Sequence, residues 1–258
     1  MFSKSTTKTT LALIPYLNCE PFYEGLSALD FEIVREVPRE LGRLAEAGVA
    51  TCGPMAVADY LRLRDRLEPL GDFGIASEGP VHSVLLFARR EIRRLSGAQV
   101  GLTVESSTSA ALVRMLLQKR YALEGVRFRR GEDAADAARL LIGDRALRAA
   151  SEGLEDFPFV YDLGEEWHAW QALPFVFARW VVAKEVPEED RRRIEETIAA
   201  SLANWEDRIG EIAARRGDEV GLDEEGVHEY LLGLRYRLGP VEELALETFG
   251  ALLSEMTP

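Results

Sequence analysis

The chain has 258 residues, of which 47% are hydrophobic and 29% are charged, a composition typical of a soluble globular protein. Its 44 acidic residues outnumber the 31 basic ones and give a net charge of −13 at pH 7. This balance argues against nucleic acid or an anionic membrane as a partner, because binding to phosphate groups requires a basic surface. If the ligand is an anion, the field that holds it must be local and opposed to the overall charge.

Neither the cysteines nor the apolar stretches point to export, metal binding or insertion into a membrane. Cys19 and Cys52 stand in apolar surroundings, which predicts buried reduced thiols rather than a disulfide framework or a metal site. The polar run at the N-terminus is followed by an apolar stretch of strand length, unlike a signal peptide. No apolar run is long enough to span a bilayer, so we expect a cytoplasmic protein.

The first third of the chain alternates apolar segments of strand length with helical patterns. Strands separated by helices imply parallel pairing with right-handed crossovers, which is typical of an α/β fold. The expected strands are 10–17, 30–37 and 49–53, and the expected helices are 19–26, with Pro21 at its first helical position, 38–48 and 54–65.

Two longer apolar strands, 80–90 and 173–184, share the string Phe-Ala-Arg and fall where the local pattern restarts. We interpret them as the two strands that carry the chain out of one lobe and back into it. The predicted first lobe is therefore discontinuous, residues 1–87 plus 179–258, and the second lobe is residues 88–178. Ligands of open α/β sheets bind beyond the carboxyl ends of strands, so we expect the ligand in the cleft between the lobes.

The chain from residue 186 onward is expected to form the C-terminal helices of the fold. Large apolar residues recur at helical spacing through 186–217, which predicts one long helix with a single buried stripe. Two shorter helices are expected at 226–238 and 240–256.

A cluster of hydroxyl side chains precedes an amphipathic helix in the segment "VESSTSAALVRMLLQKRY", residues 104–121. Hydroxyls favour helix N-caps, but one of the four in Ser106, Ser107, Thr108 and Ser109 would suffice as a cap. The free amides and positive dipole end of a helix start also form an anion site. We expect this cluster to bind a carboxylate, with simple capping as the alternative.

Tyr16, at the end of the first strand, and Asn18, directly after it, should face the hydroxyl cluster across the cleft. Two helix starts would then point at one volume, and dipoles with neutral donors could hold an anion without surplus Lys or Arg. Asn18 could equally be a turn or N-cap residue.

Three further polar residues are candidates from their positions alone. Ser83 lies inside an apolar strand, where a buried hydroxyl needs a partner. Asp144 stands at a strand end, where a helix cap is the favoured interpretation, and Arg145 is either a surface charge or a carboxylate clamp. The sequence contains no Gly-rich phosphate loop, no GxSxG elbow and no His or Cys cluster with metal spacing, so we expect no cofactor and no metal.

Six blocks taken in order resemble the chorismate dehydratase family of menaquinone biosynthesis by the futalosine pathway. They are "YLNCEPFYEGL", "GPVHSVLLFARREI", "GLTVESSTSAALVRMLL", "ARLLIGDRAL", "YDLGEEW" and "LPFVFARWV". The resemblance covers nearly the whole chain and implies a periplasmic-binding-protein type II fold, with two lobes and two crossover strands. Two departures fall near the expected cleft, namely Ala50 in place of an Asp and Gln171-Ala172 in place of Thr-Gly.

The resemblance implies that chorismate, a dicarboxylate, loses water to give 3-[(1-carboxyvinyl)oxy]benzoate without a cofactor. The matching polar positions are Asn18, Ser83, Ser106, Thr108 and Ser109. We expect Ser106, Thr108 and Ser109 to bind one carboxylate. Asn18 and Ser83 are expected as catalytic residues that orient the enolpyruvyl side or the departing hydroxyl.

Tyr16 and Arg145 complete the expected substrate-binding set. One alternative is 1,4-dihydroxy-6-naphthoate synthase of the same pathway, which the dehydratase-like blocks around "SVLLF" and "LPFVFARW" disfavour. The other is a non-catalytic carboxylate-binding protein of the same fold, for which we find neither an export signal nor an output domain.

Overall fold

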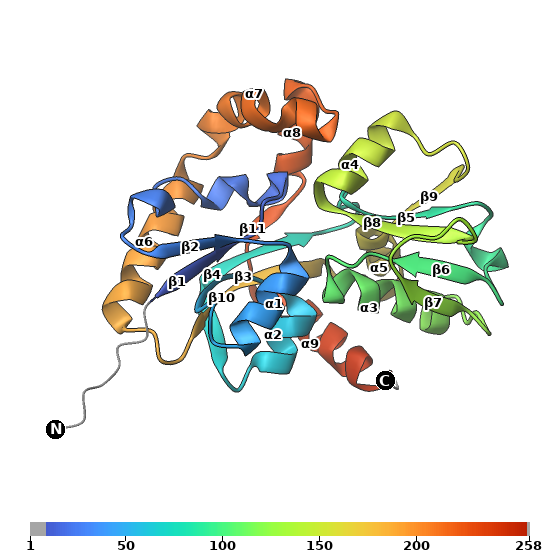
Figure 1. Ribbon diagram of the computed structural model, residues 1–258, viewed down its shortest axis with the longest axis horizontal. Coiled ribbons are helices and arrows are strands. Elements are labelled where there is room, and N and C mark those ends of the chain that lie inside the picture. The colour runs from blue at the N-terminus through green and yellow to red at the C-terminus, as the bar shows by residue number, and fades with distance from the viewer. Residues whose placement is uncertain (1–8, 257–258) are drawn as a thin grey trace.

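The protein consists of two β-sheets covered by helices, and its computed structural model describes residues 9–256 (Figure 1). Within these residues the first sheet has the strand order β11-β4-β10-β3-β1-β2, and the second has the order β7-β6-β8-β5-β9. The strands of the first sheet are β1 (Thr10–Leu13), β2 (Glu32–Arg35), β3 (Cys52–Ala56), β4 (Leu67–Ser77), β10 (Phe175–Ala183) and β11 (Arg235–Arg237). Those of the second are β5 (Val84–Ala88), β6 (Gln99–Leu102), β7 (Arg127–Arg130), β8 (Ala138–Ile142) and β9 (Phe159–Asp162).

Helices connect these strands and cover the faces of both sheets. The α-helices of the described part are α1 (Pro38–Glu46), α2 (Val57–Leu63), α3 (Ser107–Met115), α4 (Gly143–Glu152), α5 (Leu163–Gln171), α6 (Glu188–Ala203), α7 (Ile209–Val220), α8 (Glu224–Leu232) and α9 (Pro240–Ser254). Short 3-10 turns are η1 (Leu17–Phe22), η2 (Leu26–Ala28), η3 (Ile92–Arg94) and η5 (Glu206–Arg208), and α3 continues into one π-helical turn, η4 (Leu116–Arg120). None of these helices is both long and apolar enough to cross a bilayer.

The start of the chain forms the parallel part of the first sheet, as the alternating pattern predicts. Strand β1 pairs in parallel with β2 and β3, and α1 connects β2 to β3. Strand β3 runs further than expected, through Pro54 to Ala56, because these residues pair with the antiparallel β10. Helix α2 therefore begins only at Val57. This boundary is set by a pairing partner that lies far away in the sequence.

The eleven-residue strand β4 is the main element that the sequence pattern did not predict. It contains Pro69, Gly71 and Gly74, residues that weaken a strand signal, and its pairing with β10 is irregular at two places. Its second half is buried without interruption, so packing against β10 and β11 stabilises it despite its composition.

The chain passes from the first sheet to the second between Ser77 and Val84, and it returns between Asp162 and Phe175. Strand β5 pairs with β8 and β9, whereas β10 pairs with β3 and β4, so each long apolar strand belongs to one sheet and the passages precede them. Both passages come a few residues earlier than the predicted lobe boundaries. An apolar run in the sequence indicates that a strand is buried, but it does not indicate which sheet the strand joins.

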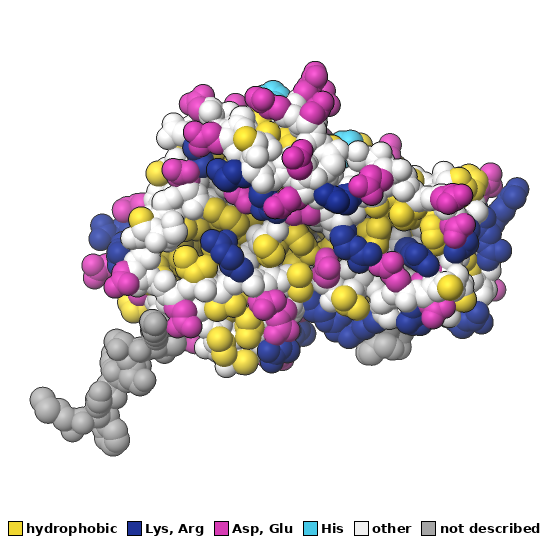
Figure 2. Space-filling model, turned by 45° about the horizontal axis from the view of Figure 1, so that its top comes forward, with side chains coloured by type: hydrophobic (Ala, Val, Ile, Leu, Met, Phe, Trp, Pro, Cys, Tyr) yellow, Lys and Arg dark blue, Asp and Glu magenta, His cyan; other side chains and the backbone are white. Residues whose placement is uncertain are grey.

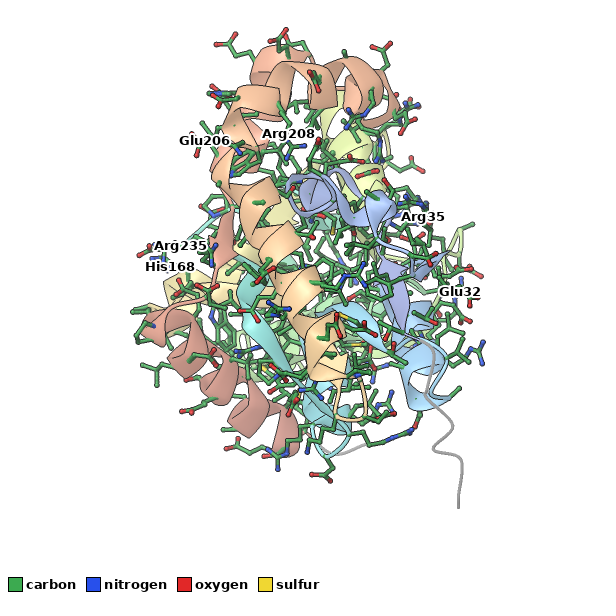
Figure 3. All side chains as sticks on the ribbon, turned by 90° about the vertical axis from the view of Figure 1, so that its left-hand side faces the viewer. Glu32, Arg35, His168, Glu206, Arg208 and Arg235 are labelled. Carbon is green, nitrogen blue, oxygen red and sulfur yellow. The ribbon has the colours of Figure 1, made fainter. Side chains whose placement is uncertain are left out.

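The expected long helix 186–217 is interrupted where α6 gives way to η5 and α7 (Figure 3). Asn204 leaves the helical conformation with φ −131° and ψ 12°. The apolar stripe survives the break, because Trp205 is buried with its ring centroid 5.2 Å from that of Tyr236. The expected helix 226–238 likewise ends at Leu232, and the edge strand β11 follows.

Candidate active site

A small cavity lies between the two sheets and has a volume of about 50 Å³. From the first sheet it is lined by Ile14, Tyr16, Asn18, Cys19, Pro38, Ala56, Ile75, Phe177 and Ala178. From the second sheet and the passage to it, the lining residues are Val81, Ser83, Val84, Ser106, Ser109, Ile142 and Gly143. Five residues predicted from the sequence therefore meet in one place, namely Tyr16, Asn18, Ser83, Ser106 and Ser109.

Helix α3 directs its start toward this cavity. Ser106 is the N-cap with extended backbone angles, and its Oγ accepts a hydrogen bond from the amide of Ser109 at 3.2 Å. Ser109 is a buried residue, and its hydroxyl makes no hydrogen bond with any residue in the described range. The first amides of a helix also lack partners within the helix. The cavity thus receives a free hydroxyl, a capping hydroxyl and the positive end of a helix dipole.

The other two hydroxyls of the cluster point away from the cavity and join the sheets. Thr108 Oγ1 accepts a hydrogen bond from the amide of Ala58 at 2.9 Å, and the Ser107 hydroxyl donates to the carboxylate of Asp59. Ala58 and Asp59 lie in the first turn of α2, on the first sheet. The structure therefore does not bring Thr108 to the cavity. One helix turn cannot aim four successive side chains in one direction.

Ser83 has the partner that its buried position requires, and this partner was not singled out from the sequence. The hydroxyl of Tyr230, in α8, donates to Ser83 Oγ at 2.8 Å, and Ser83 donates to the carbonyl of Val81 at 3.3 Å. Burial raises the pKa of Tyr230, although hydrogen bonding with Ser83 and Asn18 acts in the opposite direction. Tyr230 is therefore a neutral hydroxyl at ordinary pH. A tyrosine in a C-terminal helix gives no signal that it packs behind a distant strand.

Asn18 lies in the 3-10 turn η1 that follows the first strand. Its Oδ1 accepts a hydrogen bond from the thiol of Cys19 at 3.4 Å. Burial is the largest cause that raises the pKa of Cys19 to about 12, so this residue stays a thiol and is not a nucleophile.

Tyr16 spans the two sheets above the cavity. Its hydroxyl donates to Glu105 at 2.7 Å, and burial followed by this hydrogen bond raises its pKa. The ring packs against Gly143, which has φ +58°, and a Cβ at that position would lie 2.8 Å from the ring. Only glycine suits both the backbone angle and the close approach.

Asp144 is a cap, as expected, but for a different element. Its carboxylate accepts a hydrogen bond from the amide of Leu17 at 2.9 Å, at the start of η1, and pairs with Arg216 at 2.7 Å. Burial raises the pKa of Asp144, although the contacts with Leu17 and Arg216 both act to lower it. Asp144 therefore positions the turn that carries Asn18.

Arg145 lies outside the cavity. Its side chain is 57% exposed and forms an ion pair with Glu132. The structure does not bring this arginine together with the other predicted site residues, because it points from α4 toward solvent. This is the surface-charge alternative that the sequence left open.

The cavity lining contains no Lys, Arg, Asp, Glu or His from the described residues. Its polar groups are hydroxyls, one carboxamide, one thiol and the backbone amides of a helix start. Such an arrangement suits an anion that is held by neutral donors, and apolar side chains such as Phe177 and Ile75 form the rest of the wall. Among residues 9–256, no group of three or more His, Cys, Asp or Glu side chains is placed to hold a metal ion.

Comparison with solved structures defines the class of protein as one with a periplasmic-binding-protein-like fold. The chain superposes on protein AF1704 from Archaeoglobus fulgidus with a TM-score of 0.76 and 18% identity, covering 97% of this chain and 98% of that one. It superposes on the periplasmic aliphatic sulphonate-binding protein SsuA from Escherichia coli with a TM-score of 0.65 and 12% identity, covering 97% and 88% of the two chains. The fold predicted from the sequence is confirmed.

Comparison of sequences identifies the family within this class. A family model described as menaquinone biosynthesis matches residues 9–255. The chain is 31% identical over 261 residues to a protein named chorismate dehydratase from Thermus thermophilus, covering 94% of both sequences. The chain belongs to this menaquinone-biosynthesis family, which confirms the resemblance seen in its sequence blocks.

Proposed function

We propose that this protein is a chorismate dehydratase, a carbon–oxygen lyase that converts chorismate to 3-[(1-carboxyvinyl)oxy]benzoate and water in menaquinone biosynthesis. The observation that carries the proposal is the 31% identity to a chorismate dehydratase over 94% of both sequences. The cavity supports it independently, because its neutral donors suit a carboxylate and its apolar wall suits a ring.

The reaction breaks a ring C–H bond and the neighbouring C–O bond of the hydroxyl, and the ring becomes aromatic. Carbon is neither oxidised nor reduced overall, and the proton and hydroxide leave as water. The protein has to orient the ring, exclude water and stabilise the departing hydroxyl. With no charged base among the described lining residues, we propose that a carboxylate of the substrate accepts the ring proton.

In this proposal the start of α3 holds one substrate carboxylate. Ser106 and Ser109 donate hydroxyl hydrogen bonds, and the first amides of the helix add theirs. The net charge of −13 does not oppose this binding decisively, since the donors are neutral and close to the anion. Thr108 keeps an indirect part in the proposal, because its bond to α2 fixes the helix start.

Asn18 and Ser83 act at the other end of the substrate. Both lie beside the Tyr230 hydroxyl, which donates to Ser83 and so fixes the position of the Ser83 hydroxyl. We propose that this group of three neutral side chains orients the enolpyruvyl ether and hydrogen-bonds to the departing hydroxyl.

The cavity must enlarge for this function. Its volume of about 50 Å³ is well below the roughly 300–1,000 Å³ typical of small-molecule sites. We propose that the two sheets with their helices are two lobes, that they move apart to admit chorismate, and that the structure described here is the closed arrangement. Two buried unpaired thiols, Cys19 and Cys52, support a reducing compartment such as the cytoplasm as its location.

Incubation with chorismate tests the proposal. We expect loss of the diene absorbance together with a product lighter than chorismate by one water, measured by mass spectrometry. The Ser109→Ala variant removes one proposed donor to the substrate carboxylate and should raise KM for chorismate. Tight binding of chorismate without turnover would instead identify a carboxylate-binding protein. Turnover of the substrate of 1,4-dihydroxy-6-naphthoate synthase, but not of chorismate, would identify that enzyme.

A further inference from the structure

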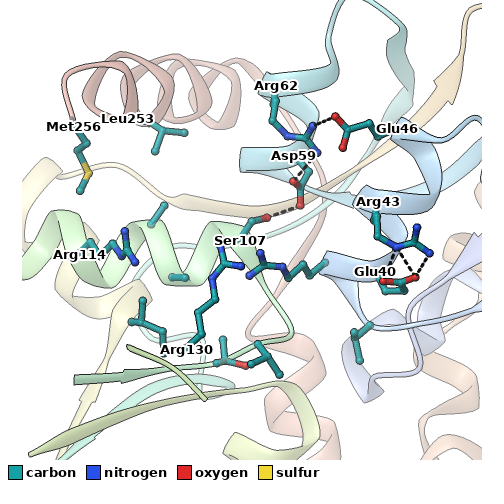
Figure 4. A pocket seen from close by; sticks show the side chains of 17 residues that line it. Glu40, Arg43, Glu46, Asp59, Arg62, Ser107, Arg114, Arg130, Leu253 and Met256 are labelled. Carbon is teal, nitrogen blue, oxygen red and sulfur yellow. Dashed lines mark hydrogen bonds and ion pairs between the residues drawn. The ribbon is translucent and has the colours of Figure 1, made fainter. Parts of the chain in front are cut away.

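A second and larger cleft lies on the opposite side of α3 from the cavity (Figure 4). It has a volume of about 640 Å³ and opens between α1 and α2 of the first sheet and α3 and β7 of the second. Helix α3 presents Ser106 and Ser109 to the cavity, and it presents Ser107, Ala110 and Arg114 to the cleft. The two spaces therefore share one helix but none of its side chains.

The lining of this cleft is basic although the protein is acidic. It contains five arginines and three acidic residues, an excess of two positive charges in a chain of net charge −13. Figure 2 shows Lys and Arg side chains crowded along the lower edge on the side of the second sheet, whereas Asp and Glu are prominent over the C-terminal helices at the top. Such segregation creates a local field that attracts anions.

Two of the five arginines are neutralised by the three acidic residues. Arg43 pairs with Glu40 at 2.6 Å, and Arg62 pairs with Glu46 at 2.7 Å and with Asp59 at 3.3 Å. These pairs account for all the carboxylates in the lining.

The other three arginines, Arg39, Arg114 and Arg130, have no carboxylate partner within residues 9–256. Arg114 is held by stacking over the Phe128 ring at 5.1 Å, and its Nε is buried without a hydrogen-bond acceptor. Arg130 reaches from the end of β7 toward Ser107, at the start of α3 (Figure 4). These three guanidinium groups therefore bring positive charge to the cleft that no carboxylate of its lining neutralises, and a bound anion would neutralise it.

We infer that this cleft binds a small organic dianion, which carries either one phosphate or two carboxylates. Arginine is the side chain best suited to both groups, because its planar donors match their oxygens in pairs. Leu253 and Met256, near the end of α9, supply an apolar wall for the body of the ligand. Arg39 comes from the first sheet, and Arg114 and Arg130 come from the second, so the bound anion links the two sheets.

Calorimetric titration of the full chain with phenyl phosphate and with phthalate tests this inference and distinguishes the two ligand types. We expect at least one of the probes to bind and to raise Tm, since the folded protein alone has the site. The Arg130→Gln and Arg114→Gln variants should each weaken binding about tenfold, the loss expected for one charged hydrogen-bonding partner.

The Arg43→Gln variant is the matched control, because it removes the same charge from the same cleft but from an arginine that is already paired. It should change the affinity by no more than about twofold, as exposed charges are screened. A second control, Ser109→Ala, alters only the cavity and should leave probe binding unchanged.

Three results would overturn the inference. The first is that neither probe binds at millimolar concentration. The second is that Arg43→Gln weakens binding as much as Arg130→Gln does. The third is that Ser109→Ala by itself abolishes probe binding. The last result would assign the probes to the cavity. Because the readout is binding, it is independent of whether the protein turns over chorismate.

Discussion

Replacing Tyr230 by Phe removes one oxygen from a fully packed position and leaves the ring in place. The lost hydroxyl donates to Ser83 Oγ at 2.8 Å, and both side chains are buried, with 4% and 1% of their surface exposed. Ser83 keeps its bond to the carbonyl of Val81 and loses only its incoming donor. We expect a loss of about 1 kcal/mol in the free energy of unfolding, the usual net value of one hydrogen bond.

This loss corresponds to a decrease in Tm of about 2–4 °C for a chain of this size. We also expect chorismate turnover to fall about tenfold, because Ser83 is no longer oriented by a donor behind it, with a smaller change in KM. Thermal unfolding and steady-state turnover of the same preparation measure both effects.

Tyr236→Phe provides the matched control within the same C-terminal region. The Tyr236 hydroxyl is also buried, but it has no hydrogen-bond partner in the described part of the chain. Removing this hydroxyl removes the free-energy cost of burying a polar group without a partner, so Tm should stay unchanged or rise. An equal decrease in Tm for the two variants, or an equal loss of turnover, would refute the role given to the Tyr230 hydroxyl.

Three further substitutions test other parts of the structure. Asn18→Ala should lower kcat more than it raises KM, and an unchanged kcat would exclude a catalytic role. Gly143→Ala should lower stability by about 1–3 kcal/mol in chemical unfolding, since φ is +58° and the new Cβ would lie 2.8 Å from the Tyr16 ring; an unaltered midpoint would contradict this. Burial, followed by a hydrogen bond to Glu166, raises the pKa of Tyr121 from 10.0 to about 12, so stability that is present below pH 10 should be lost between pH 10 and 12. Tyr121→Phe should reduce that alkaline loss, and an identical dependence of Tm on pH would refute the assignment.

Apart from Ser83, which was singled out as a polar residue in an apolar strand, the part of the site that the sequence predicted consists of residues next to strand ends and helix starts. Ser106 and Ser109 begin α3, and Asn18 follows β1, so local patterns placed them at edges of their sheets. Ligands of open α/β sheets bind beyond the carboxyl ends of strands, and the cleft between two lobes meets this rule for both sheets. This topological rule, together with the family resemblance, predicted that these residues share a cavity.

The remaining parts depended on contacts between segments far apart in the chain. Thr108 and Ser109 are neighbouring hydroxyl residues that leave the helix in different directions, and the bond of Thr108 to Ala58 could not be predicted from either segment alone. Tyr230 reaches Ser83 across 147 positions of sequence. Arg145 comes after a strand end in the sequence, as several lining residues of the cavity do, but its side chain pairs with Glu132 and points outward. Strand β4 was missed because its stability comes from the strands beside it.

The most direct test of the proposed anion site is a crystal structure with the product, 3-[(1-carboxyvinyl)oxy]benzoate, bound. We predict one carboxylate within hydrogen-bond distance of Ser106, Ser109 and the first amides of α3, with the ether oxygen near Asn18 and Ser83. A product whose carboxylates lie instead on Arg114 and Arg130, on the other side of α3, would contradict the proposal.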